Sequence, residues 1–319
     1  MTAPLVALLL AAAPAAPSVA LVPASARPGD AVLVAVSGAA AAPEGTLGGR
    51  ALRFWRDDAG WRALAPLPTE TPPGPLAVDV TAGGEHAGTA LPVVEPSFRS
   101  TVLSVPPRFV EPPPAARLRI AADRKAFEAA FAQPFAPPLF SAPFARPREA
   151  GTTGRFGDQR VYNGEKQGVH YGLDLRGAKG APVLASNDGE VVLVRDAYMS
   201  GRSIVLWHGA GVYSVYFHLS RVDVHQGMHV RRGDRLGAVG ATGRANGPHL
   251  HWGIKVDGLY VDPESMLRFD VRSATAIAAA PRAAAPPAAP VPASAPARAA
   301  APGPSAAPGS GTAPAAPTR

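Results

Sequence analysis

The chain has 319 residues, a length that allows about two compact domains. It contains 37 Pro and 33 Gly, and because globular domains average roughly 5% Pro, part of it cannot be packed core. The absence of Cys excludes a disulfide scaffold, a thiol nucleophile and cysteine-ligated metal sites. The formal net charge of +7 favours polyanionic surroundings. The Arg residues are scattered, however, and no basic stripe with interleaved aromatics indicates nucleic-acid binding.

The first twenty residues have the pattern of a cleaved secretory signal. An apolar run extends over residues 4–20 and ends in the small-x-small triplet Ser18-Val19-Ala20. Its Leu-rich part is too short to cross a bilayer, and Pro14 and Pro17 interrupt it. No Lys or Arg precedes the run, so an uncleaved Ala-rich end remains the alternative. We expect a signal peptide at 1–20, export to the periplasm or the extracellular cell wall, and no transmembrane anchor.

Residues 21–96 predict a small β-sandwich domain. Short apolar or alternating runs recur between Gly and Pro turn signals, as expected for packed antiparallel sheets. The expected strands lie at 31–36, 52–56, 61–64 and 76–80. The single histidine of this region, His86, lies in a Gly-rich stretch, and we expect it to be a solvated turn residue.

Residues 97–150 are interrupted by Pro and predict a linker with a short helix. The best helix candidate is 121–131, where Phe127 and Phe131 lie four apart on one face. We expect this helix to pack on a neighbouring domain. Residues 271–319 consist almost entirely of Ala, Pro, Gly, Ser and Thr, which cannot bury enough apolar area to offset the entropy of ordering. We expect this tail to be disordered.

Residues 151–270 predict a compact antiparallel β domain without a helical period. Apolar β-rich runs separated by turn signals occur at 182–185, 189–194, 203–207, 212–217, 235–239 and 249–254. With the sandwich before it, the expected fold is mostly β throughout.

Seven of the eight histidines lie in this compact half. His170 and Asp174 are four apart, His249 and His251 are two apart, and His218 ends an aromatic strand. Alternate residues of a strand face the same side, so each of the two pairs should project together. Three nitrogen or oxygen ligands with one open position are typical of catalytic zinc. A neutral imidazole can then act as a base near neutral pH.

These motifs resemble the signature of lysostaphin-type, LytM-like zinc metalloendopeptidases, a family with peptidoglycan DD-endopeptidase-like members. The connecting segments Gly189–Val192 and Gly227–Asp234 match it, as does Thr242-Gly243 followed by Gly247–His251. Ala245-Asn246 replaces the usual Ser neighbourhood. The resemblance covers about 154–268, and the β-rich amino-terminal segment also resembles the small domain found ahead of some bacterial members.

The resemblance implies a role for each motif residue. It implies a LytM-like (duplicated hybrid motif) fold in which His170, Asp174 and His251 bind one Zn2+. His249 would be the general base on the zinc-bound water, and His218 would orient it or stabilise the oxyanion. The implied activity is that of a secreted endopeptidase that hydrolyses peptide bonds in peptidoglycan stem peptides or cross-bridges.

The alternative is a non-catalytic LytM-like module that binds the wall or activates an amidase, although the complete ligand set argues against it. We expect a monomer whose partner is a peptidoglycan peptide and not a nucleic acid. The remaining histidines of the compact half, His208, His225 and His229, are expected to be solvated in loops, and Tyr171 is a candidate for the groove wall.

Overall fold

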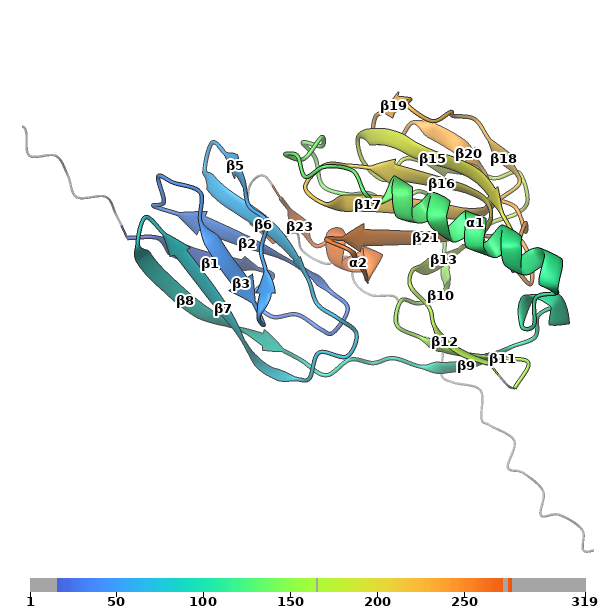
Figure 1. Cartoon of the computed structure of the whole chain (residues 1–319), viewed down its shortest axis with the longest axis horizontal. Coiled ribbons are helices and arrows are strands. Elements are labelled where there is room, and N and C mark those ends of the chain that lie inside the picture. Colours follow the sequence, from blue (N-terminus) through green and yellow to red (C-terminus); the bar gives the residue numbers. More distant parts are fainter. Residues whose placement is uncertain (1–15, 165, 272–274, 277–319) are drawn as a thin grey trace, which may run out of the picture. The chain divides into compact units, whose positions relative to one another are not determined.

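The computed structural model describes residues 16–164, 166–271 and 275–276. These residues belong to one compact unit and are mostly β, with antiparallel sheets, which confirms the expected fold class (Figure 1). Most of the segments expected as signal peptide and disordered tail lie outside the described residues. No helix within the described ranges is long and apolar enough to span a bilayer.

Two four-stranded antiparallel sheets form a β-sandwich in the amino-terminal region (Figure 1). The first has the order β1-β2-β6-β5, with bounds Ser18–Val22, Ala31–Ser37, Gly60–Pro66 and Trp55–Asp57. The second has the order β4-β3-β7-β8, with bounds Arg50–Ala51, Glu44–Leu47, Gly74–Ala82 and Glu85–Val93. Apolar side chains from both sheets, among them Val32, Val34, Val78 and Val80, pack together between them.

Three details of this region differ from the expected pattern. Strand β1 pairs with β2 along its length, from Ser18 opposite Ser37 to Val22 opposite Leu33, so a boundary after residue 20 falls inside a strand. The strand expected at 52–56 begins only at Trp55. His86 is exposed as expected, but it lies in β8 rather than in a turn.

The position of strand β2 explains why its sequence is continuously apolar. Residues 31–36 are all buried, and neighbouring residues of a strand face opposite sides of the sheet. Val32 and Val34 belong to the sandwich core, whereas Leu33 belongs to a core shared with the carboxy-terminal half of the molecule. The first sheet is therefore buried on both faces, and an unbroken apolar run is the pattern such a strand requires.

The compact half is built on an eight-stranded sheet. Its order is β10-β13-β21-β17-β16-β15-β19, with β22 paired to β21. The bounds are Thr152–Gly154, Leu173–Arg176, His249–Val256, Val212–Leu219, Gly201–Trp207, Gly189–Ala197, His229–Val230 and, for β22, Leu259–Val261. A smaller sheet joins β14 Pro182–Leu184, β20 Arg235–Ala238 and β18 Arg221–Val222. All six runs expected to be strands in this half are strands.

Two short elements follow the eight-stranded sheet. The helix α2 covers Pro263–Met266, and the Asp262 side chain caps it by accepting a hydrogen bond from the backbone N–H of Glu264. The strands β23 Phe269–Asp270 and β24 Thr275–Ala276 form a hairpin. The expectation of a helix-free compact half is therefore wrong by one short helix, which is too brief to produce a helical period.

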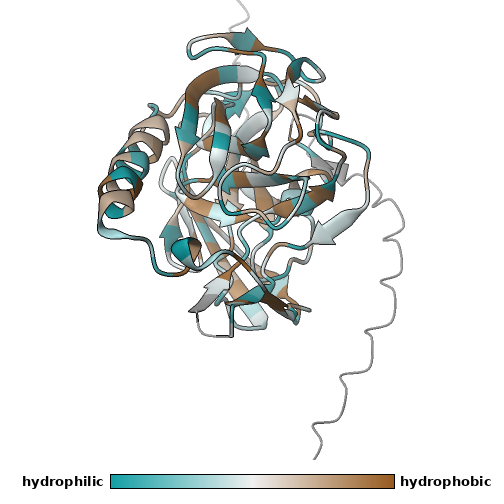
Figure 2. Cartoon of the chain, turned by 90° about the vertical axis from the view of Figure 1, so that its right-hand side faces the viewer, coloured by the Kyte–Doolittle hydropathy of each residue, from teal (hydrophilic) through white to brown (hydrophobic). Residues whose placement is uncertain are grey.

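The expected helix between the two regions exists and is longer than its apolar pattern. The helix α1 covers Pro114–Ala130, and Figure 2 shows polar and apolar residues interleaved along it. Its Phe127 ring meets Phe217 edge-on at 5.7 Å, and Phe131 meets Tyr213 at 5.3 Å between ring centroids. The helix therefore packs on strand β17 of the eight-stranded sheet, as expected.

The beginning of the segment expected to be a linker, residues 97–150, also forms regular structure. Strand β9, Ser100–Leu103, pairs in parallel with β11, Gln159–Tyr162, which pairs antiparallel with β12, Lys166–Val169. The Asn163 side chain accepts from the backbone N–H of Val105 at 2.8 Å and donates to its carbonyl at 2.9 Å. A 3-10 turn at Pro107–Phe109 follows. Residues before α1 therefore build one wall of the compact half.

Candidate metal and active site

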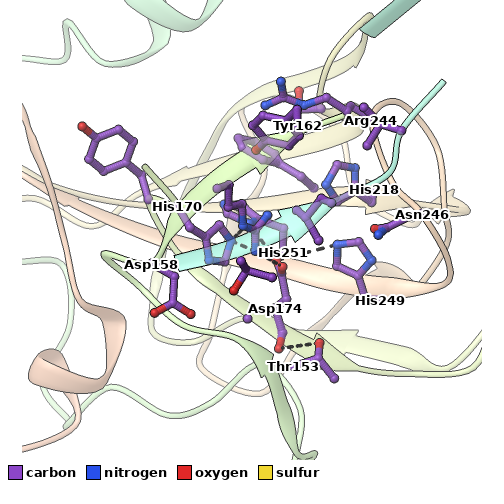
Figure 3. A pocket seen from close by; sticks show the side chains of 18 of the residues that line it. Thr153, Asp158, Tyr162, His170, Asp174, His218, Arg244, Asn246, His249 and His251 are labelled. Atoms are coloured by element: carbon purple, nitrogen blue, oxygen red, sulfur yellow. Dashed lines mark hydrogen bonds and ion pairs between the residues drawn. The ribbon is translucent and has the colours of Figure 1, made fainter. Parts of the chain in front are cut away.

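The three expected metal ligands lie close together, two on adjacent strands and one in the segment before β13, where the sequence had suggested a strand (Figure 3). Asp174 on β13 lies directly opposite His251 on β21 in the antiparallel register. His170 lies after β12 and before β13. Gly172 permits the close approach of this segment, because a Cβ at that position would lie 2.7 Å from the His251 ring.

The donor atoms of these residues converge on one point. His170 Nε2 lies 3.1 Å from Asp174 Oδ1 and 2.9 Å from His251 Nδ1, and His251 Nδ1 lies 3.0 Å from Asp174 Oδ1. Zinc bonds of about 2.0–2.2 Å in a tetrahedral site separate two ligand atoms by about 3.3–3.6 Å. A small outward movement of each side chain would therefore accommodate the ion.

The hydrogen bonds around the site leave lone pairs directed inward. His170 Nδ1 lies 2.7 Å from the carbonyl oxygen of Arg155 and must donate to it, so Nε2 carries a lone pair that faces Asp174. Burial alone would raise the pKa of Asp174, but the two imidazoles beside it, His170 and His251, hold that pKa well below its usual value of 3.8. An ionised carboxylate and an imidazole lone pair facing each other fit a divalent cation.

Burial also keeps His251, the third candidate ligand, in its neutral form. It lowers the pKa of His251 to about 4, against the opposing hydrogen bond to Asp174. A neutral imidazole is the form that binds a metal. The ring of Phe217 stacks on His251 at 5.2 Å and fixes its orientation.

The other two expected residues border the same point. His249 Nδ1 donates to the Gly247 carbonyl at 2.9 Å, and its Nε2 lies 3.7 Å from Asp174 Oδ1. His218 Nδ1 donates to the Thr242 carbonyl at 2.8 Å. The two rings lie 4.9 Å apart. Both residues therefore keep Nε2 free of a backbone partner.

His218 has an unusual backbone conformation and a buried ring. Its φ is +65°, in the left-handed region that non-glycine residues seldom adopt and that is enriched at functional sites. Burial, with the nearby charges of His249 and His251, lowers the pKa of His218 to about 3. The side chain is therefore a neutral acceptor at neutral pH.

An arginine that no motif indicated completes the surroundings of the ligands. Arg160 on β11 contacts Asp174 Oδ2 at 2.5 Å, and both side chains are largely buried. The two carboxylate oxygens of Asp174 therefore have different partners, because Oδ1 faces the histidines and Oδ2 faces Arg160. Arg160 is not part of any short motif with the candidate ligands, so no residue spacing in the sequence could have identified it.

The site opens into a cavity of about 520 Å³. Tyr171 lines it, as expected from the sequence. The remaining walls come from segments far apart in the chain, including Thr101, Leu103 and Val105 before α1 and Arg244 and Asn246 before β21.

The expectation of a solvated loop residue is wrong for His208 and is confirmed for His225, whereas His229 is exposed as expected but lies in β19. His208 is fully buried, donates from Nδ1 to the Asp188 carbonyl at 2.6 Å and contacts Ser214 Oγ through Nε2 at 2.7 Å. Burial lowers its pKa to about 4. It packs against Phe140 and Phe144, which lie before the compact half in the chain. The local sequence around His208 does not reveal that a distant segment of the chain covers this side chain.

Comparisons with known proteins agree with this geometry. Residues 168–263 match the model of Peptidase family M23. The chain is 37% identical over 108 residues to peptidoglycan DD-endopeptidase ShyA of Vibrio cholerae, a match covering 34% of this chain and 24% of that protein. It is 39% identical over 98 residues to DD-carboxypeptidase/endopeptidase Mpg of Neisseria meningitidis, covering 31% and 23%. The chain thus spans about a quarter of the length of these curated relatives.

A solved structure shows similarity over a larger part of the chain. A Pseudomonas aeruginosa protein assigned to peptidase M23 is similar at 28% identity with a TM-score of 0.58, covering 76% of this chain and 95% of that one. The likeness therefore extends beyond the residues matched by the family model. Together with the metal-ligand geometry, these matches show that the chain carries a LytM-like domain of peptidase family M23.

Proposed function

We propose that this chain is a secreted, zinc-dependent metalloendopeptidase that hydrolyses peptide bonds in the stem peptides or cross-bridges of peptidoglycan. The observation that carries the proposal is the convergence of His170, Asp174 and His251 at 2.9–3.1 Å in a cavity that His249 and His218 also line. The names of the curated relatives support peptidoglycan as the substrate class.

We assign His170, Asp174 and His251 as the ligands of one Zn2+. When bound, the ion supplies a Lewis acid that polarises the scissile carbonyl and lowers the pKa of water. Three protein ligands leave a position open, as in catalytic rather than structural zinc sites. Arg160 holds the second oxygen of Asp174, so this carboxylate presents one oxygen to the ion.

His249 is assigned as the general base. Its Nδ1–H is held by the Gly247 carbonyl, which leaves the Nε2 lone pair to take a proton from the attacking water. The same nitrogen can then return the proton to the leaving amine. The 3.7 Å between Nε2 and Asp174 Oδ1 places the base within one water of the ligand cluster.

His218 is assigned to orient the water. Because its pKa is lowered to about 3 and its Nδ1–H is engaged by Thr242, its Nε2 can accept a hydrogen bond but has no proton to donate at neutral pH. These properties favour orientation of the nucleophile over stabilisation of an oxyanion.

Export is part of the proposal because peptidoglycan lies outside the cytoplasmic membrane. The apolar run ahead of β1 supports it. Amino-terminal sequencing of the mature protein tests it. An end at or before Ser18 would leave β1 whole, and an intact Met1 would contradict cleavage of a leader.

The test of the enzyme assignment compares two neighbouring histidines. We expect His251→Ala to lose both zinc and hydrolysis of purified peptidoglycan, because one ligand is gone. His249→Ala should keep its zinc and lose activity by about a hundredfold or more, because only the base is removed. Zinc content by elemental analysis and fragments by mass spectrometry are the measurements.

His225→Ala, at an exposed position outside the cavity, is the matched control and should behave like the parent protein. Full activity of either active-site variant would contradict the role given to that residue. Stoichiometric zinc without turnover on any peptidoglycan type would favour the non-catalytic wall-binding module instead.

A further inference from the structure

The end of the cavity away from the metal ligands carries a cation with no role in the proposed hydrolysis. Arg244 lines the cavity beside His218, in the loop between β20 and β21 (Figure 3). Its guanidinium carbon lies 4.3 Å from the centroid of the Tyr162 ring. This position places a positive group in the cavity that also contains the candidate metal ligands.

The loop that carries Arg244 is held in place. The backbone N–H of Arg244 donates to the Met199 carbonyl at 2.7 Å. The preceding residue, Gly243, has φ of +71° and lies so close to the chain at Met199 that a Cβ would lie 2.5 Å from the same carbonyl oxygen. The guanidinium is therefore presented from a fixed backbone rather than from a free loop.

The ring beneath Arg244 is also rigid. Tyr162 is buried and packs in one cluster with Val105, Phe109 and Val110. Stacking on an aromatic ring engages the face of a guanidinium, whereas its five N–H donors lie in its plane. The ring therefore restrains the cation, and no described residue accepts a hydrogen bond from its guanidinium.

The charges of the cavity leave Arg244 without an acidic partner among the described residues. Asp158 accepts the backbone N–H groups of Arg99 and Arg155, each at 3.2 Å. Asp174 is engaged by Arg160 and by the histidines. No ion pair joins Arg244 to a carboxylate in the described ranges. A partly buried, unpaired guanidinium in a ligand cavity is suited to binding an anion from outside the protein.

We propose that Arg244 binds a free carboxylate of the peptide substrate, with its guanidinium held over the ring of Tyr162. This inference rests on the proposed function and narrows it, because it names the substrate as a peptide with an ionised carboxylate next to the scissile segment. A planar carboxylate can accept two parallel N–H bonds from the guanidinium. Arg244 is therefore a specificity-determining residue that contributes to substrate binding rather than to bond cleavage.

The test uses a purified cross-linked muropeptide dimer and the same dimer after carbodiimide conversion of its carboxylates to carboxamides. In the parent protein, amidation should raise KM by about tenfold or more, the loss expected for a charge-assisted hydrogen bond. Arg244→Gln should raise KM for the untreated dimer by a similar factor of about ten, with kcat within about twofold. Amidation should then have no further effect on this variant, because the two changes remove the same contact.

Two control variants separate charge from geometry. Arg244→Lys keeps the charge without the planar fork and should give an intermediate KM. Arg231→Gln removes a charge from an exposed turn outside the cavity and should match the parent protein. Equal zinc content in all four proteins excludes an indirect effect through the metal site.

Calorimetric measurement of Kd for both dimers decides the proposal independently of turnover. If the parent protein binds the untreated dimer more tightly and Arg244→Gln loses that preference, the carboxylate role holds even where no cleavage occurs, and only the proposed hydrolysis fails. If the parent protein binds the two dimers equally or binds neither, the role of Arg244 is overturned. The role of Arg244 is overturned as well if Arg244→Gln still prefers the untreated dimer over the amidated dimer as strongly as the parent protein does.

Discussion

The sandwich region and the eight-stranded sheet are both antiparallel β structures, but their interiors differ. Aliphatic side chains of both sandwich sheets pack together in one hydrophobic cluster, and among the described residues of this region the only buried charged side chains are Asp30 and Arg62. The compact half buries His170, Asp174, His208 and His218 in the strands of its sheet or directly beside them. Each of these buried groups has a specified hydrogen-bond partner, because an unpaired polar group in an apolar interior costs free energy.

The comparison shows that similar backbones support different tasks. Apolar strands need only volume and alternation to pack. A buried imidazole also needs a carbonyl or carboxylate at one particular place, and the structure supplies these from distant segments such as Arg155 for His170 and Thr242 for His218. The two regions are nevertheless joined, because Leu33, Trp55 and Leu64 of the first sandwich sheet belong to the core of the compact half.

The largest expected effect tests whether the two regions are energetically separate. Leu33→Ala removes a fully buried side chain from the shared core and should lower the free energy of unfolding by about 2–5 kcal/mol. Because the core is shared, urea unfolding followed by circular dichroism should show a single transition for the whole molecule. The urea midpoint of that transition should be lower in the variant. Val102→Ala, at a position 71% exposed, should change little. Two transitions, of which only the first moves, would show that the regions unfold independently.

The next effect concerns the buried histidine outside the active site. Burial lowers the pKa of His208 from 6.5 to about 4, so between these pH values the unfolded chain binds a proton that the folded chain does not. The stabilisation is present above pH 6.5 and is lost as the pH falls towards 4, by about 3 kcal/mol in total.

Replacing the ring should remove this dependence. The difference in unfolding free energy between pH 7 and pH 4.5 should be smaller in His208→Gln than in the parent protein. His225→Gln, at an exposed position, should retain the parental difference. An unchanged pH dependence in His208→Gln would show that this imidazole is not the titrating group.

A smaller effect tests the support of the metal ligands. Arg160→Gln leaves Asp174 Oδ2 without its charged partner and should weaken zinc binding by about tenfold or more. Competition with a chelator of known affinity measures this directly. Arg231→Gln is the control for the loss of one positive charge. Parental zinc affinity in Arg160→Gln would mean that the ion pair does not position the ligand.

The smallest effect lies where the sandwich meets the compact half. Burial, together with the charges of Asp30 and Glu264, raises the pKa of Asp262 to about 7, so the protonated form is favoured in the fold. The stabilisation is fully present below pH 3.8 and is lost progressively as the pH rises from there through 7. Asp262→Asn, which resembles the protonated form, should raise Tm slightly at pH 8, by less at pH 5, and not at pH 3.

The side chain of Asp262 is only partly buried, so solvent screening keeps the expected shift to a few degrees at most. Asp58→Asn, at an exposed position of the sandwich, is the control. A lower Tm for Asp262→Asn at pH 8 would show that the carboxylate is stabilising there.

Much of the fold could be predicted from short runs of sequence. The apolar segments of the compact half became strands because β-rich runs between turn signals have few other structures available. Strand β8, Glu85–Val93, was missed because its exposed polar and small residues weaken the alternation. Strand β9 was missed because its parallel partner β11 lies more than fifty residues further along the chain.

The sequence by itself determined which side chains could form the centre, and it placed His249 and His251 on one face because side chains alternate along a strand. His170 lies outside the strands, before β13, so its approach to Asp174 was not set by strand periodicity. Only the tertiary structure decided that β13 and β21 lie side by side, that Arg160 reaches Asp174, and that His208 is buried. The physical reason is that periodicity acts along one strand. Strand pairing, desolvation and charge neighbours depend instead on which distant segments the folded chain brings into contact.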